Sequence, residues 1–168
     1  MILTELLHHR VEDAYHAAEG LFALVDEDKL SWKPATGSNW MTAAQLLKHM
    51  TDACGAAMKG FVTGEWGPPP GDQEDTLPAA EKLPAVKSVE EARRALAADK
   101  RLALEMIAKA GETHLTQETV AAPWDPTPRL LGYQLNAMID HLISHKAQLF
   151  YYLKLQGKPV HTGHLWGM

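Results

Sequence analysis

Four stretches of the chain place apolar residues every three or four positions, and this rhythm limits the fold more than any other feature. The spacing matches the roughly 3.6 residues of a helical turn, so each stretch has one apolar face. Capping and turn residues bound the stretches and predict helices over residues 2–25, 42–63, 88–110 and 128–156. No run of alternating β-branched residues suggests a strand. The sequence therefore predicts an all-α four-helix bundle.

Capping residues mark where three of these helices begin. Two pairs match the capping box, in which side chains satisfy free backbone amides: Thr42 with Gln45, and Ser88 with Glu91. For the last helix we expect Thr127 as the N-cap and Pro128 in the first helical position. Gly111 and Gly157 are expected just after the ends of the third and fourth helices.

The connections between the helices differ in length. Trp32 and Trp40 are expected to pin the loop between the first two helices against the bundle. Residues 65–87 are rich in proline, and at about 3.3 Å per residue they can run the length of a helix. An up-down-down-up order of the helices is therefore allowed, and so is simple up-down-up-down with a decorated loop. Residues 111–127 are expected to form a further loop.

The composition of the chain limits the classes of function that are compatible with it. A chain of 168 residues, 46% of them hydrophobic, is the size of one domain with its own core, so residues 1–168 are expected to form a single domain. The net charge of -5 argues against a nucleic-acid partner. Apolar runs fall far short of the ~20 residues of a membrane span, and the start of the chain lacks the pattern of a signal peptide. With Cys54 as the one cysteine, we expect a cytoplasmic protein.

Histidines supply the strongest sign of chemistry. His141 and His145 lie one helical turn apart, where both imidazoles can reach a single ion at ~2.0–2.1 Å. No glutamate follows His141, so this is not the HExxH motif of zinc proteases. His49 lies at the margin of the apolar face of the second helix, and packing can bring it beside the pair. The alternative is that all three are ordinary hydrogen-bonded residues at the edge of the core.

Other candidate groups have ordinary explanations. A solvated helix face explains His9, Asp13 and His16, and a flexible C-terminal segment explains His161 and His164. Cys54 is expected to be a small core residue. Three polar residues lie close to the histidines and are candidates to orient them or a substrate: Asp52, Gln148 and Tyr152.

Two segments together resemble the DinB family of metalloenzymes. The first is LSWKPATGSNWMTAAQLLKHM, which contains His49, and the second is IDHLISHKAQLFYYLKLQGKPV, which contains His141 and His145. The resemblance covers essentially the whole chain. It implies an up-down-down-up bundle in which these three histidines hold a divalent metal ion. It also implies a homodimer, since relatives are often dimers.

Characterised members of the family include thiol S-transferases and thiol-dependent isomerases. The resemblance therefore implies a metal-dependent transferase, or a hydrolase, that acts on a small-molecule substrate such as a low-molecular-weight thiol. A metal-binding bundle without catalysis, serving as a stress or interaction protein, is the alternative. Three imidazoles suit zinc, nickel, iron or copper, so the sequence leaves the metal open.

Overall fold

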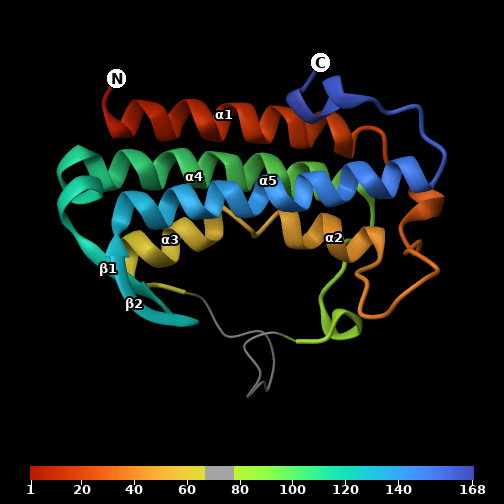
Figure 1. Cartoon of the computed structure of the whole chain (residues 1–168), viewed down its shortest axis with the longest axis horizontal. Helices are drawn as coiled ribbons and strands as arrows, with labels where there is room; N and C mark the ends of the chain where they lie inside the picture. The colour runs from red at the N-terminus through yellow and green to blue at the C-terminus, as the bar shows by residue number, and fades with distance from the viewer. Residues whose placement is uncertain (67–77) are drawn as a thin grey trace.

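Long helices packed side by side form the body of the protein (Figure 1). The computed structural model describes residues 1–66 and 78–168, so residues 67–77 of the predicted connection lie outside the described part. The α-helices in that part are α1 Leu3–Phe22, α2 Ala43–Met50, α3 Gly55–Thr63, α4 Val89–Gln117 and α5 Leu131–Leu155. Three short 3₁₀ helices accompany them: η1 Glu27–Lys29, η2 Ala80–Lys82 and η3 Thr162–Trp166. The prediction of a mostly helical protein is confirmed.

Contacts between distant residues fix how the helices run. The Glu112 carboxylate on α4 accepts the backbone amide of Leu3 at the start of α1, at 3.0 Å, so these two helices are antiparallel. Beyond the other end of α1, Asp26 pairs with Lys158, which follows α5. Helices α1 and α5 therefore run in the same direction, as the colours of Figure 1 also show.

One hydrophobic core lies between the helices. On α1 the buried residues recur every three or four positions, as the sequence predicts: Leu7, Val11, Ala14, Ala18 and Leu21. Burying a leucine of this kind contributes about 1.5–3 kcal/mol. All five α-helices supply buried side chains to the same cluster, so the bundle is held mainly by apolar packing.

The predicted helix over residues 42–63 is wrong in its middle. Thr42 and Gln45 form the expected capping box and begin α2, but α2 ends at Met50. Residues 51–54 form an irregular turn, and α3 then begins at Gly55. This break lies at the centre of the bundle, where Figure 1 shows α2 and α3 separated beside α5.

The segment between α4 and α5 also differs from the prediction. The first part of α4 ends at Gly111 as predicted, because this residue has a φ of 67° and a ψ of 168°, outside the helical region, and a second helical piece follows it to Gln117 where a loop was expected. Residues expected to form a loop pair instead as the hairpin of β1 (Thr119–Ala122) and β2 (Asp125–Leu130). Thr127 and Pro128 lie within β2 rather than at a helix start, and α5 begins at Leu131. The helix is delayed because Val120 pairs with Arg129 and Thr119 with Leu130.

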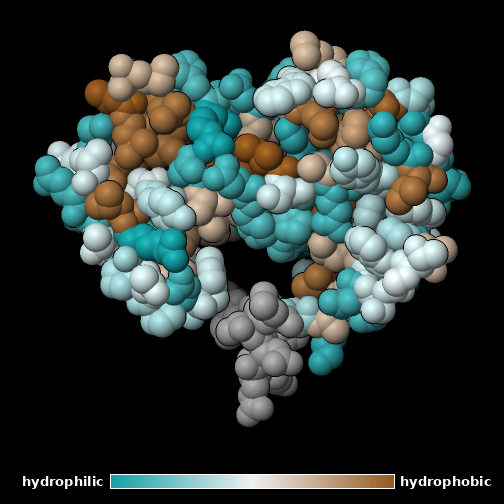
Figure 2. Space-filling view, in the orientation of Figure 1, coloured by the Kyte–Doolittle hydropathy of each residue, from teal (hydrophilic) through white to brown (hydrophobic). Residues whose placement is uncertain are grey.

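The surface seen in Figure 2 is mostly hydrophilic, with hydrophobic side chains gathered in a few places. Ile2 and Leu6 are exposed apolar residues at the start of α1. Among the described residues, no helix combines the length and the apolar character needed to cross a membrane.

Candidate metal centre

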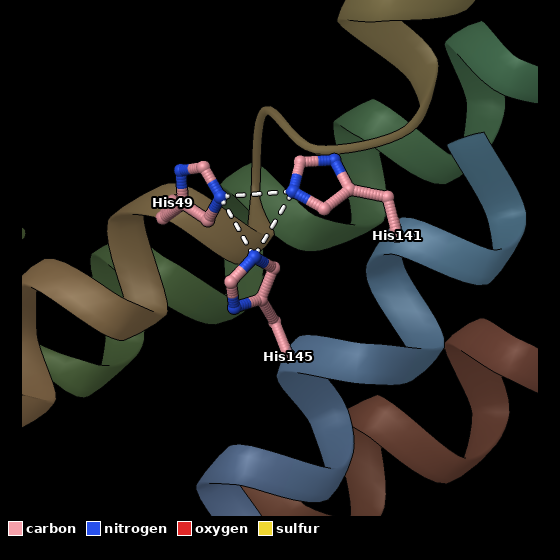
Figure 3. A group of neighbouring side chains, drawn as sticks. All are labelled: His49, His141 and His145. Atoms are coloured by element: carbon pink, nitrogen blue, oxygen red, sulfur yellow. Dashed lines mark hydrogen bonds between the residues drawn. The ribbon is translucent and has the colours of Figure 1, made fainter. Parts of the chain in front are cut away.

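Three histidine side chains converge between two helices near the middle of the bundle. His49 lies in the last turn of α2, and His141 and His145 lie one turn apart on α5 (Figure 3). All three are half-buried, as expected for residues at the margins of two apolar faces. The helix break after Met50 lies next to the site, so the local fold of residues 51–54 bears directly on its geometry.

The three Nε2 atoms form a nearly regular triangle. They lie 3.2 Å apart between His49 and His141, 3.0 Å between His49 and His145, and 3.0 Å between His141 and His145. A circle through atoms with these separations has a radius of about 1.8 Å, which is shorter than a metal–imidazole bond of ~2.0–2.1 Å. An ion can therefore lie at bonding distance from all three nitrogens, on one side of their plane. The donor set fits a divalent metal ion.

A chain of hydrogen bonds fixes the proton on the His145 ring. The Tyr152 hydroxyl donates to the carbonyl of Met41 at 2.9 Å, so this hydroxyl accepts from the Gln148 amide at 3.3 Å. That orientation turns Gln148 Oε1 toward His145 Nδ1, at 3.0 Å, and Nδ1 must donate. A neutral His145 then carries its lone pair on Nε2, facing the other two rings.

His141 presents its Nε2 atom to both of the other rings. This nitrogen lies 3.0 Å from His145 Nε2 and 3.2 Å from His49 Nε2 (Figure 3). Since Nε2 of a neutral His145 carries a lone pair, it can only accept a hydrogen bond from a neighbouring ring or bind a cation.

Three mutual contacts cannot all be hydrogen bonds in any case. Each nitrogen either donates or accepts a hydrogen bond, so among three nitrogens at least two are both donors or both acceptors. Those two cannot bond to each other. Burial, and then the neighbouring His145 and His141, lower the pKa of His49 to about 4. Burial also lowers the pKa of His141 and of His145. The site therefore favours neutral imidazoles, the form that binds metals.

The structure places the other candidates as follows. Gln148 and Tyr152 lie beside the histidines as predicted, whereas the carboxylate of Asp52 pairs with Lys48 at 2.6 Å and does not support His49. Cys54 is fully buried, as expected, and burial raises the pKa of its thiol to about 12.

The remaining histidines lie apart from this cluster. His16 contacts the carbonyl of Gly167, and the rings of His161 and His164 contact each other. In the described ranges, none of them joins a group of three metal-binding side chains.

Sequence reasoning missed two residues next to the site. Asp99 and Tyr15 are buried and bond to each other, and Asp99 also accepts the first two amides of α3, from Gly55 and Ala56. The available signal was the position of Asp99 on the apolar face of the third predicted helix, between Leu96 and Ala103. A carboxylate on a core face needs hydrogen-bonding partners, so it indicates a buried polar contact.

Comparisons with known proteins agree with this architecture. A crystal structure of a DinB-like protein from Bacillus subtilis, YjoA, superposes with a TM-score of 0.66 at 18% identity, over 92% of this chain and 94% of that chain. This similarity supports the fold. No curated protein matches the chain. The sequence profile of the DinB superfamily matches residues 10–149, which include all three clustered histidines. The chain belongs to the DinB superfamily.

Proposed function

We propose that this protein binds one divalent metal ion through His49, His141 and His145. The observation that carries the proposal is the triangle of Nε2 atoms at 3.0–3.2 Å, in which the hydrogen bond of His145 Nδ1 to Gln148 leaves the lone pair of His145 Nε2 free. Membership of the DinB superfamily supports the same proposal. Zinc, nickel and iron all accept three imidazoles, so metal analysis must identify the ion.

We further propose that the site acts on a small molecule, as a thiol S-transferase or, alternatively, as a hydrolase. Among the described residues the cluster contains three ligand side chains, so an ion there keeps at least one position for a ligand from solution. A bound divalent ion supplies Lewis-acid chemistry, which lowers the pKa of a thiol or of water at that position. A low-molecular-weight thiol is the substrate class that we favour, because the family resemblance points to it.

The surrounding residues of the chain orient the ligands. Gln148 and Tyr152 hold the His145 ring through the chain of bonds that ends at the Met41 carbonyl. Trp32 packs edge-on against Tyr152, with ring centroids 5.1 Å apart, and keeps that hydroxyl in place. These contacts confine the imidazole to one orientation, which reduces the entropy lost when a ligand binds.

Metal analysis and a thiol-transfer assay test the proposal together. We expect freshly purified protein to contain about one equivalent of metal and to accelerate transfer of a thiol to an aromatic halide. His141→Ala should contain no metal and show no acceleration. Metal in the parent without turnover of any thiol or ester would favour the alternative, a non-catalytic metal-binding bundle. Absence of metal, together with failure to take up zinc, nickel or iron, would exclude both the metal-dependent enzyme and the non-catalytic metal-binding bundle.

Two features of the family extend the proposal to the whole molecule. The directions of α1, α4 and α5 support an up-down-down-up order of four helical segments, with α2 and α3 counted as one segment. We also propose a homodimer, as the resemblance implies. Light scattering at micromolar concentration checks this, and a monomer would contradict it.

A further inference from the structure

A cavity of about 610 Å³ lies where α1, α5 and the 3₁₀ helix η3 meet. The C-terminal segment that carries η3 lies beside α1 in Figure 1. On α5 the cavity is lined by Ile143, Lys146 and Ala147, which at about 100° per residue lie on the face opposite the histidine cluster. The volume falls within the range of about 300–1,000 Å³ that is typical of pockets for small molecules. The cavity is therefore separate from the candidate metal centre and large enough for a ligand.

Lys146 brings a positive charge into the wall of this cavity. The residue is only 7% exposed, and lysine is almost never fully buried without a partner. Its ammonium donates to the Leu165 carbonyl of η3 at 2.6 Å, which uses one of its three donors. No ion pair in the described part of the chain includes this ammonium. A buried charge of this kind is stabilised by an opposite charge that also accepts its hydrogen bonds.

Two further charged side chains line the cavity from α1. The Arg10 guanidinium donates to Asp140 at 2.7 Å and also to Asn136, so its charge is already compensated. The Asp13 carboxylate is exposed, and it repels a ligand that carries several negative charges. The cavity therefore favours an anion with a single charge, for which Lys146 is the uncompensated partner.

The rest of the cavity wall is mainly apolar. Ile143 and Leu165 pack against the hydrophobic core and also line the cavity. Trp166 lines it too, and this large side chain is 71% exposed. Covering exposed tryptophan surface with an apolar group removes that surface from water and favours binding. A ligand with an apolar body thus gains contacts that a small inorganic anion does not.

We propose that this cavity binds a small monocarboxylate with an apolar body. The carboxylate accepts hydrogen bonds from the Lys146 ammonium, and the apolar body lies against Ile143, Leu165 and Trp166. A carboxylate matches the site because it has one negative charge and two oxygens that accept charge-assisted hydrogen bonds. The site shares no residue with the candidate metal centre, so either proposal can fail without the other.

Calorimetric titration of the protein with octanoate tests the proposal. We expect octanoate to bind at one site, and 1-octanol, octylammonium and acetate each to bind at least about tenfold more weakly. The alcohol lacks the charge, the ammonium ion repels Lys146, and acetate lacks the apolar body. Equal affinity for octanoate and 1-octanol would overturn the proposal, because the charge of Lys146 would then have no role. Equal affinity for octanoate and acetate would overturn it as well.

Lys146→Met removes the charge and keeps most of the side-chain volume. We expect affinity for octanoate to fall about tenfold or more, as is typical of losing a hydrogen bond to a charged group. Lys154→Met is the matched control, because Lys154 is an exposed lysine on the same helix and does not line the cavity. It should bind octanoate as the parent does. Equal affinities in the two variants would contradict the proposal.

Asp13→Asn provides a second variant if Lys146→Met does not fold. Asp13 is exposed, so its replacement disturbs little packing. Loss of its negative charge should raise affinity for octanoate about twofold or more at low ionic strength. An unchanged or lower affinity would overturn the proposal.

Indole NMR locates the bound octanoate. We expect the Trp166 ring signals to shift during the titration, because this residue lines the cavity. Trp124 is also exposed but lies at the β1–β2 hairpin, and its signals should stay unchanged. Shifts at Trp124 without shifts at Trp166 would place the ligand elsewhere and overturn the proposal.

Discussion

At the scale of single residues, the histidine cluster combines three imidazoles with a supporting side chain. Gln148 bonds His145 Nδ1 and places a proton on this nitrogen, which faces away from the cluster. His49 comes from the opposite helix and closes the triangle with His141 and His145. The proposed ligands and the supporting Gln148 should therefore respond differently to substitution.

Replacing one of the three proposed ligands should release the ion. We expect His49→Ala, His141→Ala and His145→Ala each to weaken metal binding more than the about 10- to 100-fold that is typical of losing a supporting group. His9→Ala and His161→Ala should bind as the parent does, because these residues lie outside the cluster. Isothermal titration with Zn²⁺ measures all five. Full affinity in His141→Ala would show that the site is assigned wrongly.

Replacing the supporting amide should weaken the site without removing it. Gln148→Ala leaves His145 Nδ1 without its partner, so we expect affinity to fall about 10- to 100-fold. Gln148→Glu keeps an acceptor in place and should retain affinity. Asp52→Ala is the control, because the Asp52 carboxylate pairs with Lys48 instead of a histidine. Chelator competition distinguishes the three variants, and equal affinity in Gln148→Ala and Asp52→Ala would contradict this role.

The pKa of His49 predicts a pH dependence of the metal-free protein. Burial lowers this pKa from 6.5 to about 4, so between these values the unfolded chain binds more protons than the folded chain. The contribution of His49 to stability is thus present above pH 6.5 and is lost as the pH falls toward 4. In chelator-treated protein, the ring proton resonances of His49 should shift with a midpoint near 4. A midpoint near 6.5 would mean that the ring is solvated.

At the scale of elements, locally encoded features were predictable and tertiary ones were not. Thr42 with Gln45 begins a helix as predicted, because the capping box lies within four residues. The break after Met50 was missed because the carboxylate that accepts the amides following it, Asp99, lies 44 residues from Gly55 in the sequence. Thr127 has the chemistry of an N-cap but lies in β2, because pairing with β1 overrides its local preference.

The capping box of α2 should contribute measurably to stability. Thr42→Ala removes the acceptor for the Gln45 amide, so we expect the free energy of unfolding to fall by about 1 kcal/mol. Ser144→Ala is the control, since it also removes a side-chain hydroxyl from a helical segment but lies exposed within α5. Urea unfolding followed by circular dichroism measures both. An equally large loss in Ser144→Ala would show that the capping bond of Thr42 makes no special contribution to the free energy of unfolding.

At the scale of the whole molecule, the histidine cluster joins two helices that are far apart in the sequence. His49 lies 92 residues before His141 and 96 before His145, so an ion there would link α2 to α5. The sequence could predict which histidines meet, because each lies at the margin of an apolar helix face. It could not predict the tautomer of His145, because this depends on the carbonyl of Met41, a backbone group that carries no side-chain signal.

Such a link predicts that metal stabilises the folded protein. An ion that binds only the folded state adds RT ln(1 + [L]/Kd), or about 2.7 kcal/mol at a free concentration of 100 Kd. For a chain of this size that corresponds to a rise in Tm of about 5–11 °C, which differential scanning calorimetry resolves. A chelator should therefore lower the Tm of the parent protein and leave that of His141→Ala unchanged. An equal fall in the two proteins would mean that the stabilising ion binds elsewhere, because only the parent keeps all three nitrogens of the cluster.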